Sequence, residues 1–306
     1  MGDILTMSKI KTLINLMREK PSAIIRVAGH YGFLKWIPDK VYLKMIYLIE
    51  TGKKLNLSNP KTYSEKLQWI KLYDRKNLYT KLVDKYAVRK YIAATIGENY
   101  LIKLIGIYNS VDEIDWDILP NEFVLKCTHG SGSNIICIDK NHFDIDNAKI
   151  KLREWMKHNW FWFGREWPYL NVKPRITCEE FLSNNGEVPE DYKVLCFNGK
   201  AKLIEVHTDR FADHKQDFYD IKWNKTEISQ GTPRSHIIIN KPKILENMLQ
   251  LSEILSQNTY HVRIDWYVVE NKLYFGEITF FDASGFCPFD KENDELMLGD
   301  WIDLNN

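Results

Sequence analysis

A lysine at the end of an apolar segment stands directly before a loop of very small residues. In the stretch FVLKCTHGSGS, Lys126 ends a predicted buried strand, and the following loop contains Gly130, Ser131, Gly132 and Ser133. A buried ammonium group is costly unless negative charge compensates it, and such a loop exposes backbone N–H groups to an approaching anion. The pattern indicates a phosphate site, with a flexible hairpin tip and a solvated lysine as the alternative. It is not a Walker A loop, because there the lysine follows the glycines.

Two carboxylates are predicted on adjacent strands near the C-terminus. In RIDWYVVENKLYFGEIT, Arg263 and Asp265 share one face of the first strand, and Glu277 and Thr279 share one face of the second. A three-residue loop over 270–272 places Asp265 opposite Glu277, whereas a two-residue loop places them on opposite faces. If they converge, two carboxylates and phosphate oxygens supply the coordination that Mg²⁺ prefers, and Arg263 can hold a phosphoryl group. The alternative is an exposed sheet face with solvated charges.

Acidic residues also stand at the ends of two further predicted strands. Glu179 and Glu180 precede Phe181 and Leu182, and Asp191 begins the next strand. A backbone edge at this place can hydrogen-bond an adenine ring, and a later carboxylate can accept hydrogen bonds from ribose hydroxyl groups. Ordinary solvated acids at strand ends are the alternative interpretation.

The segments around these residues mix strands and helices without strict alternation. We expect strands over residues 100–108 (buried), 123–128, 133–140, 175–182, 191–207 with a turn at Asn198-Gly199, 261–269 and 273–281. We expect helices after the caps Ser64 and Thr80, the second one closed by Gly97, over residues 144–160, and from Asn240 and Pro242 onward. This mixture favours α+β lobes over a single doubly wound sheet.

The charge balance argues against a general nucleic-acid binder. The chain of 306 residues contains 42 basic and 41 acidic residues, whereas nucleic-acid binders usually carry a basic excess or stripe. Its five cysteines form no Cys-x-x-Cys pair, so neither a zinc site nor a disulfide framework is expected. Reduced thiols in the cytoplasm fit this pattern best.

The N-terminal segment leaves the question of membrane contact open. No apolar run reaches the length of about 18 residues that a transmembrane helix needs, so we expect no membrane span. Residues 10–49 mix lysine and arginine with leucine, isoleucine, methionine and tryptophan. Such a segment either rests peripherally on an anionic membrane surface, here the inner face, or packs as a helical segment on the body of the protein. We favour packing.

Together and in this order, the segments resemble the ATP-grasp fold, and most closely the TupA-like ATP-grasp proteins of bacterial surface-polysaccharide clusters. The resemblance runs from about residue 60 to the C-terminus and rests mainly on FVLK…HGSGS and VRIDWY…FGEIT. It implies two α+β lobes that clamp ATP under a Gly-rich hairpin lid. The implied parts are a helical N-terminal segment (1–60), an N-terminal lobe (61–122), a lid subdomain (123–182) and a C-terminal subdomain (183–306).

The same resemblance implies nucleotide-binding roles for individual residues. Lys126 is similar to the lysine on the nucleotide phosphates, residues 130–133 to the lid loop, and Arg89 to a basic residue that reaches the phosphates from the other lobe. Residues 179–182 resemble the hinge that reads adenine, and Asp191 resembles the ribose acid. Two further lysines are implied near the nucleotide: Lys193, on the strand face of Asp191, and more weakly Lys222 in FYDIKW.

The resemblance further implies the metal ligands and the reaction. Asp265 and Glu277 are similar to the magnesium carboxylates, and Arg263 to the arginine that steadies an acyl-phosphate; Lys126 also neutralises phosphate charge. Thr279 stands where many ATP-grasp enzymes have asparagine, so a second metal ion is doubtful. The implied activity is that of an ATP-dependent carboxylate–amine ligase that uses ATP and Mg²⁺. Its implied substrate is a sugar acid or an amino acid in capsular or cell-wall polysaccharide synthesis.

Three other functions remain open on the sequence alone. A glycosyltransferase would use an Asp-x-Asp pair, and the chain has such pairs at 115–117 and 144–146. A sugar kinase would need a general base, for which His207 and Asp209 are candidates. A non-enzymatic ATP-binding scaffold is the third alternative. The aromatic loop 160–169 either lines a pocket for the acceptor substrate or forms a packed hairpin.

Overall fold

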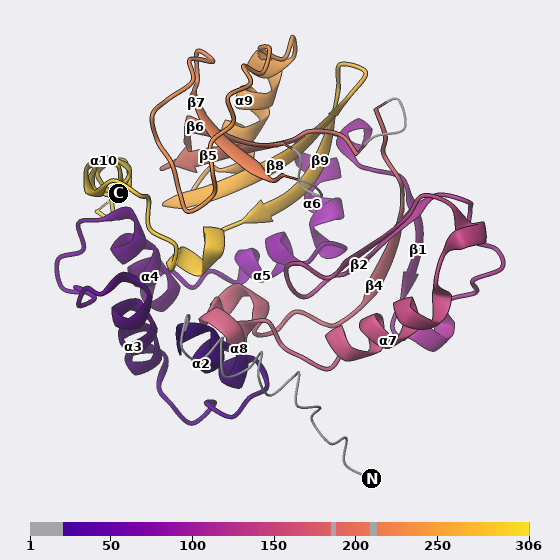
Figure 1. Cartoon of the computed structure of the whole chain (residues 1–306), viewed down its shortest axis with the longest axis horizontal. Helices are drawn as coiled ribbons and strands as arrows, with labels where there is room; N and C mark the ends of the chain where they lie inside the picture. The colour runs from indigo at the N-terminus through magenta and orange to yellow at the C-terminus, as the bar shows by residue number, and fades with distance from the viewer. Residues whose placement is uncertain (1–20, 185–187, 209–212, 306) are drawn as a thin grey trace.

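Two antiparallel sheets form the framework of the protein, which we describe from a computed structural model covering residues 21–184, 188–208 and 213–305. The four-stranded sheet has the order β1-β4-β2-β3, with β1 at Leu104–Tyr108, β2 at Phe123–Cys127, β3 at Asn134–Cys137 and β4 at Ile176–Glu180. The five-stranded sheet has the order β7-β6-β5-β8-β9, with β5 at Asp191–Phe197, β6 at Lys200–Thr208, β7 at Lys215–Asp220, β8 at His261–Val269 and β9 at Lys272–Thr279. In Figure 1 the five-stranded sheet lies at the top and the four-stranded sheet at the right.

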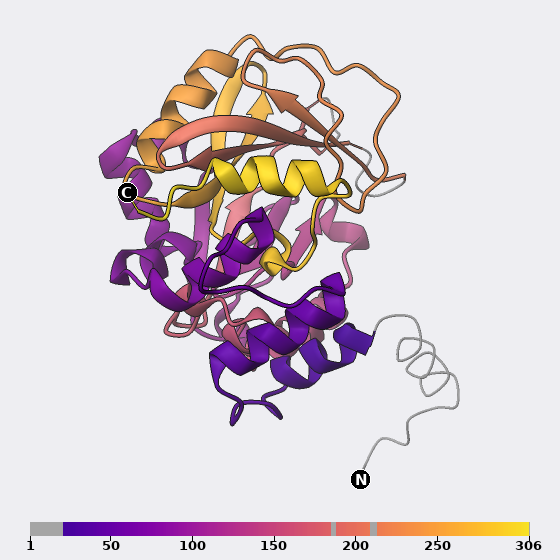
Figure 2. The same cartoon turned by 90° about the vertical axis from the view of Figure 1, so that its left-hand side faces the viewer.

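Helices pack around both sheets and form an N-terminal layer of their own. The α-helices are α2 (Pro21–His30), α3 (Asp39–Thr51), α4 (Tyr63–Tyr73), α5 (Asn77–Val83), α6 (Ala87–Thr95), α7 (Ile145–Trp155), α8 (Phe161–Gly164), α9 (Leu245–Leu255) and α10 (Glu292–Asp300). The 3₁₀ turns are η1 (Glu98–Tyr100), η2 (Val111–Glu113), η3 (Lys140–His142), η4 (Trp167–Tyr169) and η5 (Asp282–Gly285). Figure 2 shows α10 above α4, against which it packs, and the N-terminal helices at the bottom.

The alternation of residue types along β5 explains why one face of the five-stranded sheet is polar. Tyr192 and Val194 point into the largest hydrophobic core, which this sheet shares with α9 and with α4 to α6. Asp191 and Lys193 lie on the opposite face, because successive side chains of a strand alternate. Both are buried all the same, so this polar face is enclosed by other parts of the chain.

The predicted strands are present, with one correction at residues 100–108, while β7 was not predicted. β1 begins only at Leu104, because Tyr100 ends the 3₁₀ turn η1 and residues 101–103 are not part of the strand. β1 is also half-buried rather than buried, because it pairs with β4 on one side only and forms the sheet edge.

Two helix predictions also need correction. α4 is capped by Thr62 and not by Ser64: Thr62 and Glu65 form a capping box, in which each side chain accepts a hydrogen bond from the other's backbone N–H. The single helix predicted from Thr80 is broken into α5 and α6. Asp84 lies in the break and accepts hydrogen bonds from the backbone N–H of Tyr86 (2.9 Å) and of the following residue. The residue after Asp84 is Lys85, and the break brings its side chain to the space between the two sheets.

The pairing of β8 with β9 is as predicted, although the loop is not. The turn has two residues, Glu270 and Asn271, both with positive φ, so the predicted three-residue loop is wrong. A β-bulge between Asp265 and Trp266 adds one residue, Gly276, to β9 and restores the predicted alignment. Asp265 therefore lies opposite Glu277.

The division of the chain into four parts remains a proposal. β1, which belongs to the proposed N-terminal lobe, pairs with β4 of the proposed lid. The proposed helical segment is represented by α2 and α3, while its residues before 21 lie outside the described part of the chain. Within the described residues, no helix combines the length and the apolar character needed to cross a membrane.

Candidate active site

A polar cavity lies between the two sheets, and eight of the seventeen predicted site residues line it. Strands β2 and β4 contribute to it from the four-stranded sheet, and β5, β8 and β9 from the five-stranded sheet. The predicted residues that line the cavity are Lys126, Ser131, Gly132, Glu179, Asp191, Lys193, Asp265 and Glu277. Positions far apart in the sequence thus meet where the two sheets face each other.

Lys126 reaches the cavity from β2 and is held by a carboxylate. Its Nζ lies 2.7 Å from Oε2 of Glu179 on β4, and its side chain is largely buried. Arg89 contacts the other oxygen of the same carboxylate, at 3.2 Å. The side chain of Glu179 therefore neutralises two cations. The resemblance implies a separate role for this residue, in the hinge that contacts adenine. An anion near Lys126 would compete with Glu179 for the ammonium group.

The Gly/Ser loop separates the polar cavity from a second cavity with aromatic walls. Ser131 and Gly132 line both, whereas Gly130 and Ser133 line only the second. The other walls of the second cavity are two tryptophans and three histidines: Trp155, Trp160, His30, His129 and His158. A Cβ at Gly130 would lie 3.4 Å from Cβ of Trp160, an ordinary van der Waals distance, so the loop lies directly against this wall. Most residues of the aromatic loop 160–169 are buried, whereas Trp160 lines the second cavity.

An apolar cavity adjoins the polar one where β4 ends. It is lined by Glu180, Phe181 and Leu182, as well as by aliphatic residues of β2 and β3 and of the segments before β1 and β5. It shares Lys126, Asn134 and Tyr267 with the polar cavity. A flat apolar ring bound in this cavity would therefore have its polar substituents beside Lys126. The base and the phosphates of a nucleotide could occupy the two cavities in this way.

Asp265 and Glu277 face each other across β8 and β9, and lysines hold both of them. Oδ2 of Asp265 accepts a hydrogen bond from Nζ of Lys193 at 2.6 Å. Oε2 of Glu277 accepts one from Nζ of Lys85 at 2.6 Å. The Thr279 hydroxyl is 3.4 Å from Oε1 of Glu277, so it supports this carboxylate.

The buried charges of this region do not balance. Carboxylates outnumber lysine and arginine by five to three in the connected cluster of Asp191, Glu205, Asp265, Glu277, Asp282, Lys85, Lys193 and Arg263, and His207 contacts Glu205. A divalent cation would offset the excess, and carboxylate oxygens are the ligands that Mg²⁺ prefers. No group of three or more His, Cys, Asp or Glu side chains in the described residues is arranged to hold a metal ion. Asp265 and Glu277 therefore fit Mg²⁺ only together with phosphate or water oxygens.

Opposite charges keep Glu277 and Lys193 ionised, whereas burial raises the pKa of Asp265 against the effects of Arg263 and Lys193. Burial raises the pKa of Glu277, but Lys85 and Lys193 outweigh burial and hold this pKa well below its usual range. Burial lowers the pKa of Lys193, but its neighbouring carboxylates, Asp191 and Asp265 foremost, outweigh burial and raise it. Both groups therefore remain ionised at neutral pH.

Arg263 lies beside the cavity and not in its lining. Its guanidinium donates to both oxygens of Asp265, at 2.8 and 2.9 Å, and to Asp282 on the other side. Its side chain is 9% exposed, and Glu205 Oε2 is 3.7 Å away. In this arrangement Arg263 orients Asp265, and its contact with an acyl-phosphate stays a prediction.

The structure does not bring two of the predicted cations to the cavity. Arg89 lies behind Glu179 and donates to the carbonyl oxygen of Ile102 at 2.7 Å. Lys222 is exposed in the turn after β7, where its N–H donates to Asp220. The sequence analysis missed Lys85, which takes the place expected for Arg89. The Asp-Lys pair at the break between α5 and α6 is the signal that could have indicated it.

The residues that suggested other enzyme classes lie outside the cavity lining. Asp144 is the N-cap of α7 and accepts from the backbone N–H of Asn147, as a helix cap would. Asp115 and Asp117 stand in a loop, where one accepts from the backbone N–H of the other. His207 contacts Glu205 on the same strand, and Asp209 lies outside the described residues.

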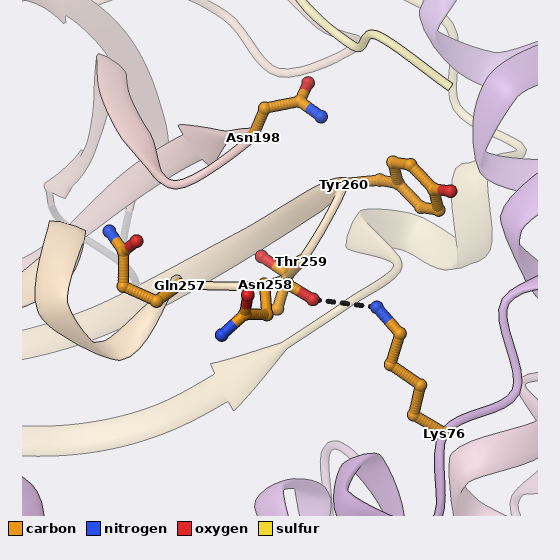
Figure 3. A pocket seen from close by; sticks show the side chains of 6 residues that line it. All are labelled: Lys76, Asn198, Gln257, Asn258, Thr259 and Tyr260. Atoms are coloured by element: carbon orange, nitrogen blue, oxygen red, sulfur yellow. Dashed lines mark hydrogen bonds between the residues drawn. The ribbon is translucent and has the colours of Figure 1, made fainter. Parts of the chain in front are cut away.

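A separate polar pocket between the end of α9 and the loop after α4 contains none of the predicted site residues. Its lining is Lys76, Asn198, Gln257, Asn258, Thr259 and Tyr260. Figure 3 shows the ammonium group of Lys76 reaching Asn258, whose backbone oxygen accepts its hydrogen bond at 2.8 Å. No carboxylate lines this pocket, so it offers no magnesium ligand comparable to Asp265.

The bulge at Gly276 leads to a first testable prediction. A Cβ at this position would lie 3.0 Å from the backbone oxygen of Asp265, so Gly276→Ala should displace the two carboxylates relative to each other. We expect kcat to fall about ten-fold, because a small misplacement of catalytic groups is costly. Steady-state kinetics of any ATP-dependent turnover measure this effect.

The matched control is Ile278→Val on the same strand. Ile278 is buried on the opposite face, so the substitution should cost about 1 kcal/mol of folding free energy without changing kcat. Unchanged turnover in Gly276→Ala would show that the bulge does not position the carboxylates.

Comparisons with known proteins bear on the family of the chain. A family model of TupA-like ATPgrasp proteins matches residues 65–303. No curated protein matches the sequence. The D-alanine–D-alanine ligase from Bacillus anthracis, complexed with ATP, is 14% identical, with 65% of this chain and 54% of that chain covered and a TM-score of 0.38. For the L-amino acid ligase from Bacillus licheniformis the identity is 11%, the coverage 82% and 55%, and the TM-score 0.42. The chain spans about half the length of these solved structures.

Proposed function

Because the chain belongs to the TupA-like ATP-grasp family, we propose that it is an ATP-dependent carboxylate–amine ligase that works through an acyl-phosphate. One observation carries this proposal. A single cavity between two sheets gathers Lys126 and the Gly/Ser loop on one side and the facing pair Asp265 and Glu277 on the other. This is what a nucleotide triphosphate and its magnesium ion require.

The nucleotide would lie across the two adjoining cavities. The adenine ring fits the apolar cavity at Phe181 and Leu182, and the phosphates then lie at Lys126 and the loop amides. Asp191, which lines the polar cavity, would accept hydrogen bonds from the ribose hydroxyls. Asp265 and Glu277 would hold Mg²⁺, which neutralises phosphate charge when it is bound. Phosphate binding would separate Lys126 from Glu179 and give it a stronger anionic partner.

The proposed reaction has two steps. In the first, a carboxylate oxygen of the substrate attacks the γ-phosphorus of ATP, the bond to the β-phosphate oxygen breaks, and ADP leaves. In the second, an amine attacks the acyl carbon, phosphate leaves, and the amine loses a proton, giving an amide. Lys126 and Lys85 would stabilise negative charge on the transferring group, and positioning supplies the remaining rate enhancement.

We further propose that the acceptor is a small sugar acid or amino acid bound in the aromatic cavity. This cavity shares Ser131 and Gly132 with the phosphate cavity, so a ligand in it would lie next to the transferring phosphoryl group. Tryptophan faces suit a sugar ring, whose polarised C–H groups pack on aromatic faces. A role in capsular or cell-wall polysaccharide synthesis in the cytoplasm is consistent with free, mostly buried cysteines.

Product analysis tests the proposed function. Purified protein is incubated with ATP, Mg²⁺, amino acids and uronic acids, and ADP and free phosphate are both measured. A ligase releases ADP and phosphate in equal amounts, and only when carboxylate and amine are both present. A kinase would leave the phosphate on its product, a glycosyltransferase would consume nucleotide sugars instead, and a scaffold would bind ATP without turnover.

A further inference from the structure

The connection between α2 and α3 exposes three large aromatic side chains. Tyr31, Phe33 and Trp36 are 53%, 73% and 79% exposed, and they follow one another within six residues of chain. In Figure 1 this connection runs along the lower margin of the molecule, away from the five-stranded sheet. Exposed apolar side chains that gather in this way usually mark an interaction surface.

The outer face of α3, which follows the three aromatic residues in the chain, also exposes apolar side chains and adds positive charge. The inner face of the helix, with Tyr42 and Ile46, packs into the N-terminal core. Val41 and Leu48 stand exposed on the outer side, and Lys44 lies between them one turn from each. We name the surface of Tyr31, Phe33, Trp36, Val41, Leu48, Lys35, Lys40 and Lys44 the basic apolar face.

The positive charge of the basic apolar face is not compensated within the described residues. The two acids of this region are occupied by arginines: Asp39 lies 2.8 Å from Arg75, and Glu50 lies 3.3 Å from Arg26. Lys40 and Lys44 form no ion pair in the described part of the chain. A docking partner must therefore provide negative charge together with an apolar layer.

We infer that the basic apolar face docks onto an anionic lipid bilayer. Tryptophan and tyrosine favour the depth of the lipid headgroups, and phenylalanine adds apolar insertion below it. Lysines on the same face would then contact lipid phosphates, a contact that weakens as salt is added. Docking would also orient the aromatic cavity, because His30 at the end of α2 lines that cavity.

Flotation of the full-length protein with lipid vesicles tests this inference. We expect binding to vesicles of equal parts phosphatidylglycerol and phosphatidylcholine to be at least about ten-fold stronger than to phosphatidylcholine alone. The double substitution Phe33→Ser with Trp36→Ser should weaken binding about ten-fold or more. Lys40→Ala with Lys44→Ala should weaken it roughly ten-fold and reduce the preference for anionic lipid.

The loop before α9 offers a matched control, because it exposes an apolar pair far from α2 and α3 in the chain. Ile237 and Ile238 are 65% and 80% exposed, and replacing both with serine should leave vesicle binding unchanged.

Three results would overturn the inference: no wild-type binding to anionic vesicles, equal binding by the Phe33/Trp36 variant, or a dimer in solution that this variant abolishes. The second result would assign binding to another part of the chain, and the third would assign the face to a second copy of the chain. ATP affinity should be the same in all these variants, which separates this inference from the proposed function.

Discussion

Replacing Asp265 by asparagine is expected to reduce ATP-dependent turnover on the order of a thousand-fold, the upper end for the loss of one electrostatic group in a transition state. The substitution keeps the shape of the side chain but removes one of the two facing carboxylates that fit Mg²⁺. It also removes the anion that holds both Arg263 and Lys193. Initial rates measured over a range of magnesium concentrations should show a higher magnesium requirement as well as a lower maximal rate.

Asp282→Asn is the matched control for this prediction. Asp282 also pairs with Arg263, but it does not line the cavity between the sheets. Both substitutions disturb the same buried ion-pair cluster and should therefore lower the thermal stability. If Asp265 acts on the nucleotide, only Asp265→Asn should change the magnesium requirement. Equal losses of activity in the two variants would assign Asp265 a purely structural role.

Lys126→Met is expected to weaken ATP binding by about ten-fold to a hundred-fold, the range for one hydrogen bond to a charged group. The methionine keeps most of the volume of the lysine stem and removes only the ammonium group. The folded state should tolerate the change, because Glu179 retains its contact with Arg89. Calorimetric titration with ATP and Mg²⁺ measures the dissociation constant directly.

Lys222→Met serves as the control for loss of a positive charge. Lys222 was also expected near the phosphates, but it is exposed in the turn after β7. Its substitution should leave the dissociation constant for ATP unchanged. A Lys126→Met protein that binds ATP as tightly as the wild type would contradict the placement of the phosphates at β2.

The predicted α+β fold class and the ATP-grasp family are confirmed by the two sheets and by the family match. The hairpin around the Gly/Ser loop could be predicted because its pattern is local: apolar strands flank a run of small residues. Lys126 pairs with Asn134 across this hairpin, so the loop must close over the end of β2. The element that lies opposite the loop is determined by tertiary packing, which a local sequence pattern does not indicate.

The alignment of Asp265 with Glu277 was predicted correctly, although the loop length on which the prediction rested is wrong. A two-residue turn alone would have placed the carboxylates on opposite faces, and the bulge at Gly276 compensates for it. An isolated glycine inside a strand pattern is a known sign of a bulge, so this residue could have indicated the correction.

The error of placing Arg89, and not Lys85, at the cavity has a different cause. The sequence predicted one continuous helix from Thr80, and the family resemblance implied that Arg89 on it reaches the phosphates. Asp84 instead ends α5 by hydrogen-bonding the first N–H groups of α6, and Arg175 pairs with its other oxygen at 2.6 Å. The contact with Arg175, ninety-one residues away, stabilises the break and lies outside any sequence window.

The most direct test of the proposed site is a crystal structure of the protein with Mg²⁺ and a non-hydrolysable ATP analogue. We predict the triphosphate in the cavity between the sheets, with Lys126 on one side and Asp265 and Glu277 on the other. The ion pairs of Lys126 with Glu179 and of Lys85 with Glu277 should open as the phosphates and the metal enter. A nucleotide bound elsewhere, or one whose phosphates face away from Asp265 and Glu277, would contradict the proposal and with it the ligase mechanism.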